Sequence, residues 1–198
     1  MNEEHHLLLP VIPLREACLF PAASLTLAID RPGLLKAVEL GERVGGRVLA
    51  VGYHDAGPGS PMAQDFFSVG TVAHLAERQA LADGSQQVEL DGLQRARIGQ
   101  LLGPDTAEVV PLSEGDADEE WGPAVEALAR YLHAHADLRA FLEEQRRSPE
   151  PMSWVNLACQ HLPITPTARL KLLEATAPER CLKISRGLDA LLRKEKGD

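Results

Sequence analysis

The sequence predicts an α+β protein in which a β-rich part, residues 1–112, precedes a small helical bundle, residues 121–198. In the first part, apolar residues alternate with small or polar ones, which is the pattern of half-buried strands. In the second part, apolar residues recur every three or four positions, which is the pattern of amphipathic helices. An acidic segment, residues 113–120, separates the two patterns. Each part alone would bury a modest core, so we expect the two to pack together.

Strands are expected where short apolar or β-branched runs end at glycine, proline or charged residues. The segments that fit are residues 25–29, 47–53, 67–75, 86–90, 98–102 and 107–112. Asp83-Gly84 follows the third of them and predicts a tight hairpin of type I′, because both central positions of that turn need positive φ. One helix, residues 32–44, is expected to interrupt the strands and to end at Gly45-Gly46.

The helical part opens on a stripe formed by Trp121, Val125, Leu128 and Leu132, at spacings of four, three and four. Thr165 followed by Pro166 predicts an N-cap and the first position of a helix, where the missing N–H of proline costs nothing. The other expected faces are Leu138, Phe141 and Leu142 after a cap at Asp137, residues 154–162 after a break at 148–151, and Cys181, Ile184, Leu188 and Leu191 after Pro178.

The acidic segment, residues 113–120, holds five carboxylates and no large apolar side chain. We interpret it as a linker or as a solvated lead-in to the first helix of the bundle. Acidic residues favour the latter position because the free N–H groups of a helix start carry partial positive charge.

Composition excludes several classes of function. The net charge of −9 argues against a nucleic-acid partner, because phosphate backbones are held mainly by clustered Lys and Arg. The longest nearly apolar run, residues 7–14, is far shorter than the roughly 18–20 residues of a membrane span. The first six residues carry two glutamates and no Lys or Arg, unlike a secretory signal, so we expect a cytoplasmic protein that contacts no membrane.

Neither cysteine nor histidine spacing indicates a cofactor or metal site. Three cysteines, Cys18, Cys159 and Cys181, are too far apart in sequence for a zinc motif and are expected as buried thiols. His133 and His135 are two positions apart on an expected helix and so point to different faces. We expect no metal, no cofactor and no catalytic residue.

Three ordered blocks carry a resemblance to a known family. They are LPVIPL (residues 9–14) with LFP (19–21), then VGTVA (69–73), LADGS (81–85) and DGLQRARI (91–98), then LPI (162–164) with Arg169 and Arg180. Together they resemble the amino-terminal domain of Lon-type proteases over residues 9–192. The motif residues, which we expect to be structural, are Pro13, Leu14, Phe20, Pro21, Gly70, Thr71, Asp83, Gly84, Gly92, Arg95 and Arg97.

The resemblance implies a PUA-like, barrel-type sheet followed by a helical bundle. In Lon proteases this domain helps to recognise unfolded or tagged substrates and to assemble the hexamer, and short stand-alone forms exist. This sequence contains no Gly-x-x-x-x-Gly-Lys-Ser/Thr loop, and none of its serines lies in the Gly-Pro-Ser-Ala-Gly setting of the Lon peptidase. We therefore expect a free-standing relative without ATPase or peptidase activity.

Arg95 and Arg97, two residues apart on an expected strand, allow two interpretations. Their guanidinium groups could dock acidic groups of a partner, since each offers five fixed donors to a carboxylate. Alternatively, they could brace the barrel by pairing with a carboxylate or with backbone carbonyls.

Aromatic residues make up 4% of the chain, so their positions are informative. Tyr53, Met62, Phe66 and Phe67 surround an expected loop, residues 54–65, and loops on rigid scaffolds often carry binding residues. We hypothesise that this loop and the start of the helical part, together with Trp154, line a groove for an exposed apolar protein segment. Core packing is the alternative for each of them.

The leading interpretation of the whole chain is a non-enzymatic protein-binding module that acts as an adaptor, a holdase or a regulator of a protease. Its expected partners are unfolded or exposed apolar protein segments, with a homo-oligomer or a protease complex as the assembly. An RNA-binding PUA-like protein and an unrecognised hydrolase are the alternatives. Filter binding to structured RNA and a screen for peptidase and esterase activity would discriminate among the three.

Overall fold

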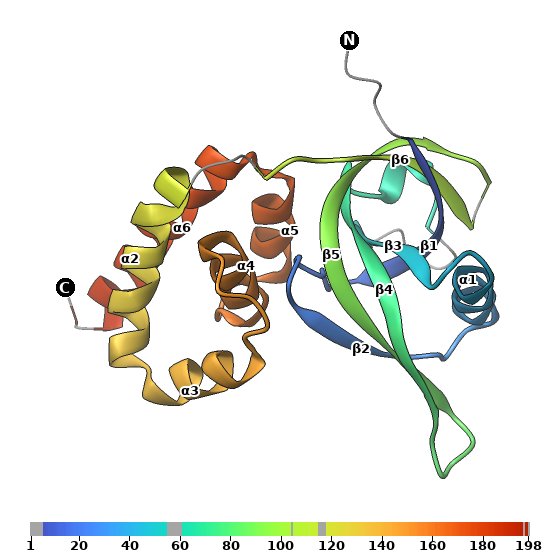
Figure 1. Cartoon of the computed structure of the whole chain (residues 1–198), viewed down its shortest axis with the longest axis horizontal. Helices are drawn as coiled ribbons and strands as arrows, with labels where there is room; N and C mark the ends of the chain where they lie inside the picture. Colours follow the sequence, from blue (N-terminus) through green and yellow to red (C-terminus); the bar gives the residue numbers. More distant parts are fainter. Residues whose placement is uncertain (1–5, 55–60, 104, 115–117, 196, 198) are drawn as a thin grey trace.

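The computed structural model describes residues 6–54, 61–103, 105–114, 118–195 and 197, and confirms the α+β prediction. A barrel lobe and a helical lobe lie side by side (Figure 1). The barrel lobe consists of β1 (Leu7–Arg15), β2 (Ser24–Ala28), α1 (Pro32–Arg43), β3 (Arg47–Tyr53), the 3₁₀ turn η1 (Ala63–Asp65), β4 (Val69–Ala80), β5 (Gln86–Leu101) and β6 (Thr106–Pro111). The helical lobe consists of α2 (Asp118–Ala134), α3 (Ala136–Gln145), α4 (Pro151–His161), α5 (Pro166–Glu174) and α6 (Ala177–Glu195).

The sheet closes into a barrel. Its strand order is β2-β5-β4-β3-β1-β6. An additional pairing of β6 with β5 closes the five strands β5, β4, β3, β1 and β6 into a ring, and within the described residues β2 pairs with β5 alone. β1 and β3 are parallel, with Val11 opposite Leu49, and the other pairings are antiparallel. Because side chains alternate along each strand, every barrel strand sends one set of residues inward. The inward set is Leu9, Val11, Leu49, Val51, Val72, Ala96, Ala107 and Val109.

The outward-facing set joins the two lobes into one core. Ile12, Phe20 and Ala73 from the barrel lobe belong to the same buried cluster as Leu128 and Leu173 from the helices. The lobes also touch at Gly52, where a Cβ atom would lie 2.3 Å from Leu170 Cδ2 of α5. A side chain at position 52 would therefore displace the Leu170 side chain at this junction.

Polar contacts add to this apolar junction. The Gln160 side chain of α4 donates to Cys18 O at 3.0 Å and accepts from Phe20 N at 3.0 Å. Glu174 at the end of α5 accepts from both Ser68 N at 3.0 Å and Ser68 Oγ at 2.7 Å. These bonds set the orientation of the helical lobe because each one joins a helix to the barrel lobe at a fixed place.

The strands differ from expectation in two places. The run at residues 7–14 contains two prolines and was not predicted as a strand, yet it forms β1. Residues 86–102 were predicted as two strands, but β5 continues through Gly92. Gly92 N donates to Ala23 O at 2.8 Å, and a Cβ atom there would lie 2.2 Å from Phe20 O. The glycine thus marks a close approach of two backbones within a continuous strand.

The hairpin between β4 and β5 exists, but its predicted turn type is wrong. Gly84 takes a φ of 84°, whereas Asp83 does not take positive φ as a type I′ turn requires. Gly84 N instead donates to Leu81 O at 3.0 Å, and the Asp83 carboxylate accepts from Ser85 N at 2.9 Å. The Ser85 hydrogen bonds also lower the pKa of the Asp83 carboxyl. Asp83 therefore acts through its side chain rather than through a left-handed backbone.

The helices follow the predicted faces, with small shifts at their starts. Trp121, Leu128 and Leu132 are buried as the stripe predicts. The N-cap at Thr165 is confirmed, because Thr165 Oγ1 accepts from Ala168 N at 3.2 Å. Asp137 is not a cap: the N-cap position of α3 is His135, and Asp137 lies in the first turn. Within the described residues, every helix is too short or too polar to cross a membrane.

Candidate functional site

An apolar groove between α5 and α6 is the candidate binding site of the helical lobe. Its volume is about 430 Å³. Its walls are mostly aliphatic side chains, and two lysines stand at its rim. The lining residues are Leu162, Ile164, Ala168, Lys171, Leu172, Lys183, Ile184, Gly187, Leu188 and Leu191.

Small residues leave this groove open. Gly187 lies in the interior of α6, and no heavy atom lies within 4 Å of the place where its Cβ atom would be. Glycine lowers helix stability by roughly 1 kcal/mol relative to alanine, so its presence in α6 is not explained by helix formation. On the facing helix α5, Ala168 is also small and Leu172 is only half-buried. The missing side-chain volume therefore leaves Leu172 accessible.

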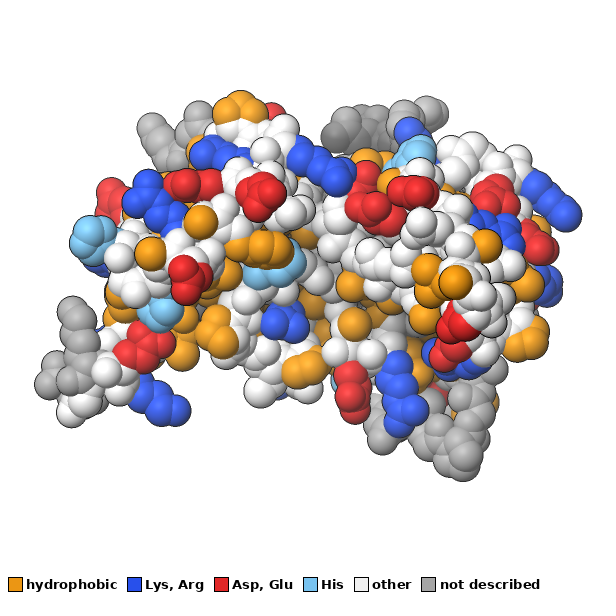
Figure 2. Space-filling model, turned by 90° about the horizontal axis from the view of Figure 1, so that it is seen from below, with side chains coloured by type: hydrophobic (Ala, Val, Ile, Leu, Met, Phe, Trp, Pro, Cys, Tyr) orange, Lys and Arg blue, Asp and Glu red, His pale blue; other side chains and the backbone are white. Residues whose placement is uncertain are grey.

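The groove has a positive rim. Lys171 and Lys183 are exposed, and no ion pair with another described residue engages either of them. Elsewhere charges are mixed: Figure 2 shows acidic and basic side chains interspersed over the visible face of both lobes. Such a groove is complementary to a polypeptide segment whose apolar side chains contact the aliphatic floor and whose neighbouring Asp or Glu side chains pair with the two lysines.

A cluster of buried charges holds α5 and α6 in place. Arg95 of β5 donates to Leu173 O at 2.9 Å and to Ala175 O at 2.8 Å, at the end of α5. Arg180 of α6 donates to Leu172 O at 3.0 Å and to Ala175 O at 3.2 Å. Carbonyl groups at a helix end lack partners within the helix and carry partial negative charge. The two arginines therefore fix the end of α5 from the barrel side and from the α6 side.

Glu114 connects these arginines. Its carboxylate pairs with Arg95 Nε and lies 3.1 Å from Arg180 Nη1, and its side chain is 9% exposed. Arg180 also donates to Asn156 Oδ1 at 2.9 Å and lies 5.7 Å from the ring centroid of Trp121. Burial lowers the pKa of Arg180, and the charge of Glu114 opposes that shift. We call Arg95, Glu114 and Arg180 the arginine cluster.

The arginine cluster corrects one expectation and bears on another. The segment 113–120 was expected to be solvated, which is wrong at Glu114 because two buried arginines recruit its carboxylate. Residues 115–117 lie outside the described residues, and α2 begins at Asp118. Of the two interpretations of Arg95 and Arg97, the bracing role fits Arg95, which is 3% exposed, whereas Arg97 is exposed.

The aromatic residues proposed from the sequence lie in different environments. Tyr53 and Phe67 are buried at 8% and 7% exposure, and Met62 is 61% exposed. Phe66 contacts the inward-facing barrel cluster and lines a separate cavity of about 260 Å³ beside the start of α1. Its ring centroid lies 6.2 Å from that of Tyr53. Within the loop itself, residues 55–60 lie outside the described residues.

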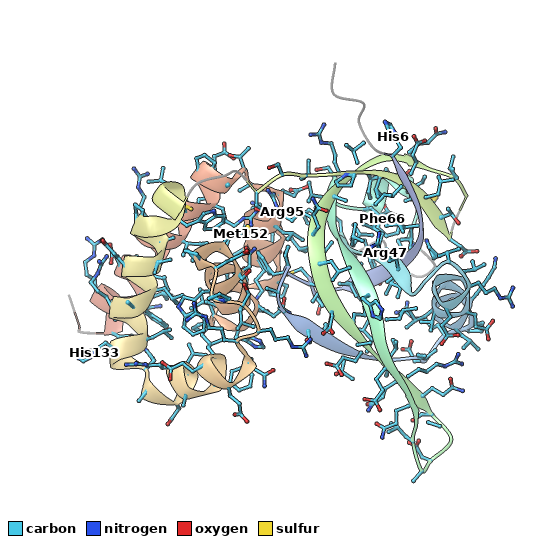
Figure 3. The ribbon with its side chains drawn as sticks, in the orientation of Figure 1. His6, Arg47, Phe66, Arg95, His133 and Met152 are labelled. Carbon is cyan, nitrogen blue, oxygen red and sulfur yellow. The ribbon has the colours of Figure 1, made fainter. Side chains whose placement is uncertain are left out.

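Trp154 belongs to the other lobe. It lies on α4 against the core shared by the lobes, with Arg146 Cζ 4.9 Å from its ring centroid. In Figure 3, Phe66 lies within the barrel lobe and Arg95 between the lobes. The groove that these aromatics were expected to share stays a prediction. Sequence reasoning missed the α5–α6 groove because Ile184, Leu188 and Leu191 had been assigned to the core, and Gly187 was the available signal.

The cysteines are poor nucleophiles. Burial raises the pKa of both Cys18 and Cys159 to about 12, and Cys181 is 4% exposed. A thiol whose pKa is raised stays protonated near neutral pH, and the reactive species is the thiolate. Within the described residues, no group of three or more His, Cys, Asp or Glu side chains is arranged to hold a metal ion.

We predict that none of the three thiols reacts with a disulfide reagent such as DTNB in the folded protein at pH 8, and that all three react after unfolding in guanidinium. Colorimetric titration of the released thiolate checks this. Rapid labelling of a cysteine in the folded state would contradict the burial described above.

Solved structures identify the fold. The fold resembles the N-terminal domain of a Mycobacterium avium complex Lon protease, with a TM-score of 0.75 and 18% identity, covering 92% of this chain and 98% of that one. It also resembles a Lon N-terminal domain protein from Xanthomonas campestris, with a TM-score of 0.60 and 20% identity, covering 89% and 95%. A barrel followed by a helical bundle is thus the fold of Lon N-terminal domains.

Sequence relatives identify the family. The model described as the ATP-dependent protease La (LON) substrate-binding domain matches residues 8–188, and the chain belongs to this family. The chain is 28% identical over 192 residues to Lon protease of Xanthomonas oryzae pv. oryzae, covering 91% of this chain and 22% of that protein. It is 33% identical over 93 residues to Lon protease of Escherichia coli K12, covering 47% and 12%. The chain therefore spans a quarter or less of the length of these relatives.

Proposed function

We propose that this chain is a non-enzymatic substrate-recognition module that binds an exposed apolar segment of another polypeptide in the α5–α6 groove. We place it in the cytoplasm, as an adaptor or holdase that presents such segments to a protease. The observation that carries the proposal is the apolar groove with its two unengaged lysines. The family supports recognition of protein substrates, since its model is described as a substrate-binding domain.

The chemistry of the groove supports binding rather than catalysis. Its lining consists of aliphatic residues, one glycine, one alanine and two exposed lysines, with no carboxylate or histidine to act as a partner acid or base. Burying one Leu or Val side chain stabilises a complex by about 1.5–3 kcal/mol. Three such side chains contribute at most about 9 kcal/mol, and association costs about 4 kcal/mol or more, so the expected affinity is weak, about millimolar. Weak affinity is suited to transient capture.

Anisotropy of a labelled peptide tests the proposal. The probe is a short amidated peptide with three leucines at helical spacing between glutamates, and its control has serine in place of each leucine. We expect saturable binding of the leucine peptide and none of the serine peptide. Equal binding of both peptides, or of neither, would rule out an apolar recognition groove.

Reversing both rim charges, Lys171→Glu with Lys183→Glu, should weaken binding of the glutamate-flanked peptide by about 3- to 10-fold at low salt. Exposed ion pairs contribute about 0.2–1 kcal/mol each and are screened by salt. The same leucines flanked by serine should bind the double variant and the wild type alike. Arg193→Glu with Lys194→Glu, at two exposed positions near the end of α6 outside the groove, reverses the same number of charges and is the matched control. Titrations at two salt concentrations measure the effect, and a loss equal to that of the control would contradict a role for the rim.

A further inference from the structure

A second cavity lies at the seam between the two lobes. Its volume is about 520 Å³, and it is formed by strands of the barrel, the end of α5 and the start of α6. Arg95, which is one of its lining residues, lies between the lobes in Figure 3. We call this cavity the seam pocket; its lining is Ser68, Val69, Arg95, Arg97, Leu112, Ser113, Glu174, Thr176, Ala177 and Pro178.

Arg97 is the unengaged charge of the seam pocket. It is exposed, it shares a strand face with Arg95, and no hydrogen bond or ion pair with a described residue engages it. Glu174 lines the same pocket, but its Oε1 atom accepts from Ser68 N and Ser68 Oγ, and its carboxylate makes no ion pair with Arg97 within the described residues. A protein with a net charge of −9 thus leaves a guanidinium free in a concave site.

The local charge balance favours a monoanion. Within the arginine cluster, Glu114 faces both Arg95 and Arg180, which leaves one positive charge uncompensated. Arg97 adds one positive charge and Glu174 one negative charge, so these side chains and the arginine cluster together carry a net charge of +1. The first residues of α6 form one wall, and the Glu179 carboxylate in its first turn accepts from Thr176 N at 3.2 Å, which offsets the partial positive charge of that helix start. A dianion such as phosphate would meet the repulsion of Glu174.

The size and walls of the pocket favour more than a small ion. Val69, Leu112 and Pro178 provide apolar surface beside Arg97. The volume of about 520 Å³ exceeds what a free carboxylate ion fills. A guanidinium binds a carboxylate through two parallel N–H···O bonds, which fixes its orientation. An apolar side chain next to that carboxylate would then lie against the apolar wall.

We propose that the seam pocket binds the carboxylate at the carboxyl-terminal end of a polypeptide, with Arg97 as its principal donor and an apolar last side chain against Val69 and Leu112. This inference rests on the proposed function and extends it. The α5–α6 groove would hold an apolar segment of the client polypeptide, and the seam pocket would hold the carboxyl-terminal end of such a polypeptide. Arg95 acts as a positioning residue because its Nε and Nη1 donors are engaged with Glu114 and with the end of α5.

The test compares two labelled peptides that differ only at their ends. Each is a short Gly-Ser sequence ending in Ala-Val, without the leucines needed by the groove, with either a free carboxylate or a carboxamide. We expect the free acid to bind wild-type protein about two- to fivefold more tightly, as one exposed ion pair allows. Arg97→Gln should remove this preference, Arg97→Lys should retain part of it, and Arg47→Gln, an exposed strand arginine outside the pocket, should leave it unchanged.

Three results would overturn the inference: equal binding of acid and amide, a preference that persists in Arg97→Gln, or equal competition by acetate, inorganic phosphate and the free-acid peptide. Failure here is distinguishable from failure of the proposed function. Gly187→Glu changes the α5–α6 groove and should leave the preference for the free acid intact, while Arg97→Gln should leave binding of the amidated leucine peptide intact.

Discussion

Replacing Arg180 by alanine is expected to lower the free energy of unfolding by about 3–5 kcal/mol, because it breaks a buried network of ion pairs and hydrogen bonds and leaves a void in the core. The substitution would leave Glu114 with Arg95 as its remaining partner, remove donors from Leu172 O and Ala175 O, and open a void in the core where Arg180 is 0% exposed. Whole domains are stable by only about 5–15 kcal/mol, so the loss would be a large share of the total.

Urea denaturation followed by far-UV circular dichroism measures this loss. Arg186→Ala is the matched control, because Arg186 is exposed on the same helix, and such surface changes usually stay within about 0.5 kcal/mol. If Arg180→Ala does not fold, Arg180→Lys retains the charge without the fork of donors and should show a smaller loss. A loss below about 1 kcal/mol for Arg180→Ala would show that the arginine cluster does not hold the lobes and the two groove helices together.

Gly187→Glu is expected to abolish binding of the leucine peptide, with a loss of affinity of about 10- to 100-fold, which corresponds to excluding one leucine side chain. The new side chain has room, since no heavy atom lies within 4 Å of its Cβ position. Its carboxylate would lie in the groove, which Lys171 and Lys183 border. There it would compete with the glutamates of the peptide for pairing with these two lysines. Folding should not suffer, because a helix interior is about 0.5–1 kcal/mol more stable without glycine.

Gly122→Glu provides a matched control for this variant. Gly122 lies in α2, away from the groove, and its Cβ position is equally free of heavy atoms within 4 Å. Both variants add the same charge and side chain to a helix, so they should share melting temperatures near that of the wild type. Anisotropy titrations should separate them, with binding retained in Gly122→Glu. Equal affinity of the two variants would mean that the groove is not the binding site.

Local patterns predicted much of the fold. A short apolar run ending at Gly52 and Tyr53 predicted the strand at residues 47–53, and the Thr165-Pro166 pair predicted the start of α5, because both signals depend only on neighbouring residues. The path of β5 through Gly92 could not be predicted in this way. It depends on the close approach of the backbone at Phe20, which is far away in sequence. Because only glycine leaves room for that backbone, Gly92 is required inside the strand, although glycine usually signals the end of one.

The sites were harder to predict than the fold. Glu114 looked solvated because its neighbours are acidic, and its burial depends on two arginines, 19 residues before it in β5 and far beyond it in α6. The α5–α6 groove exists because Gly187 has no side chain to fill it and because α5 and α6 do not cover each other's apolar faces completely. Apolar periodicity shows which face of a helix is apolar, but not whether a neighbour covers it.

Chemical-shift mapping tests the central claim most directly. The amidated leucine peptide would be titrated into ¹⁵N- and methyl-labelled protein, and the shifted resonances placed on the structure. We expect the largest changes to cluster at the groove residues Ile164, Ala168, Leu172, Ile184, Gly187, Leu188 and Leu191. Saturable binding with its largest changes in the barrel lobe, and none at α5 and α6, would contradict it.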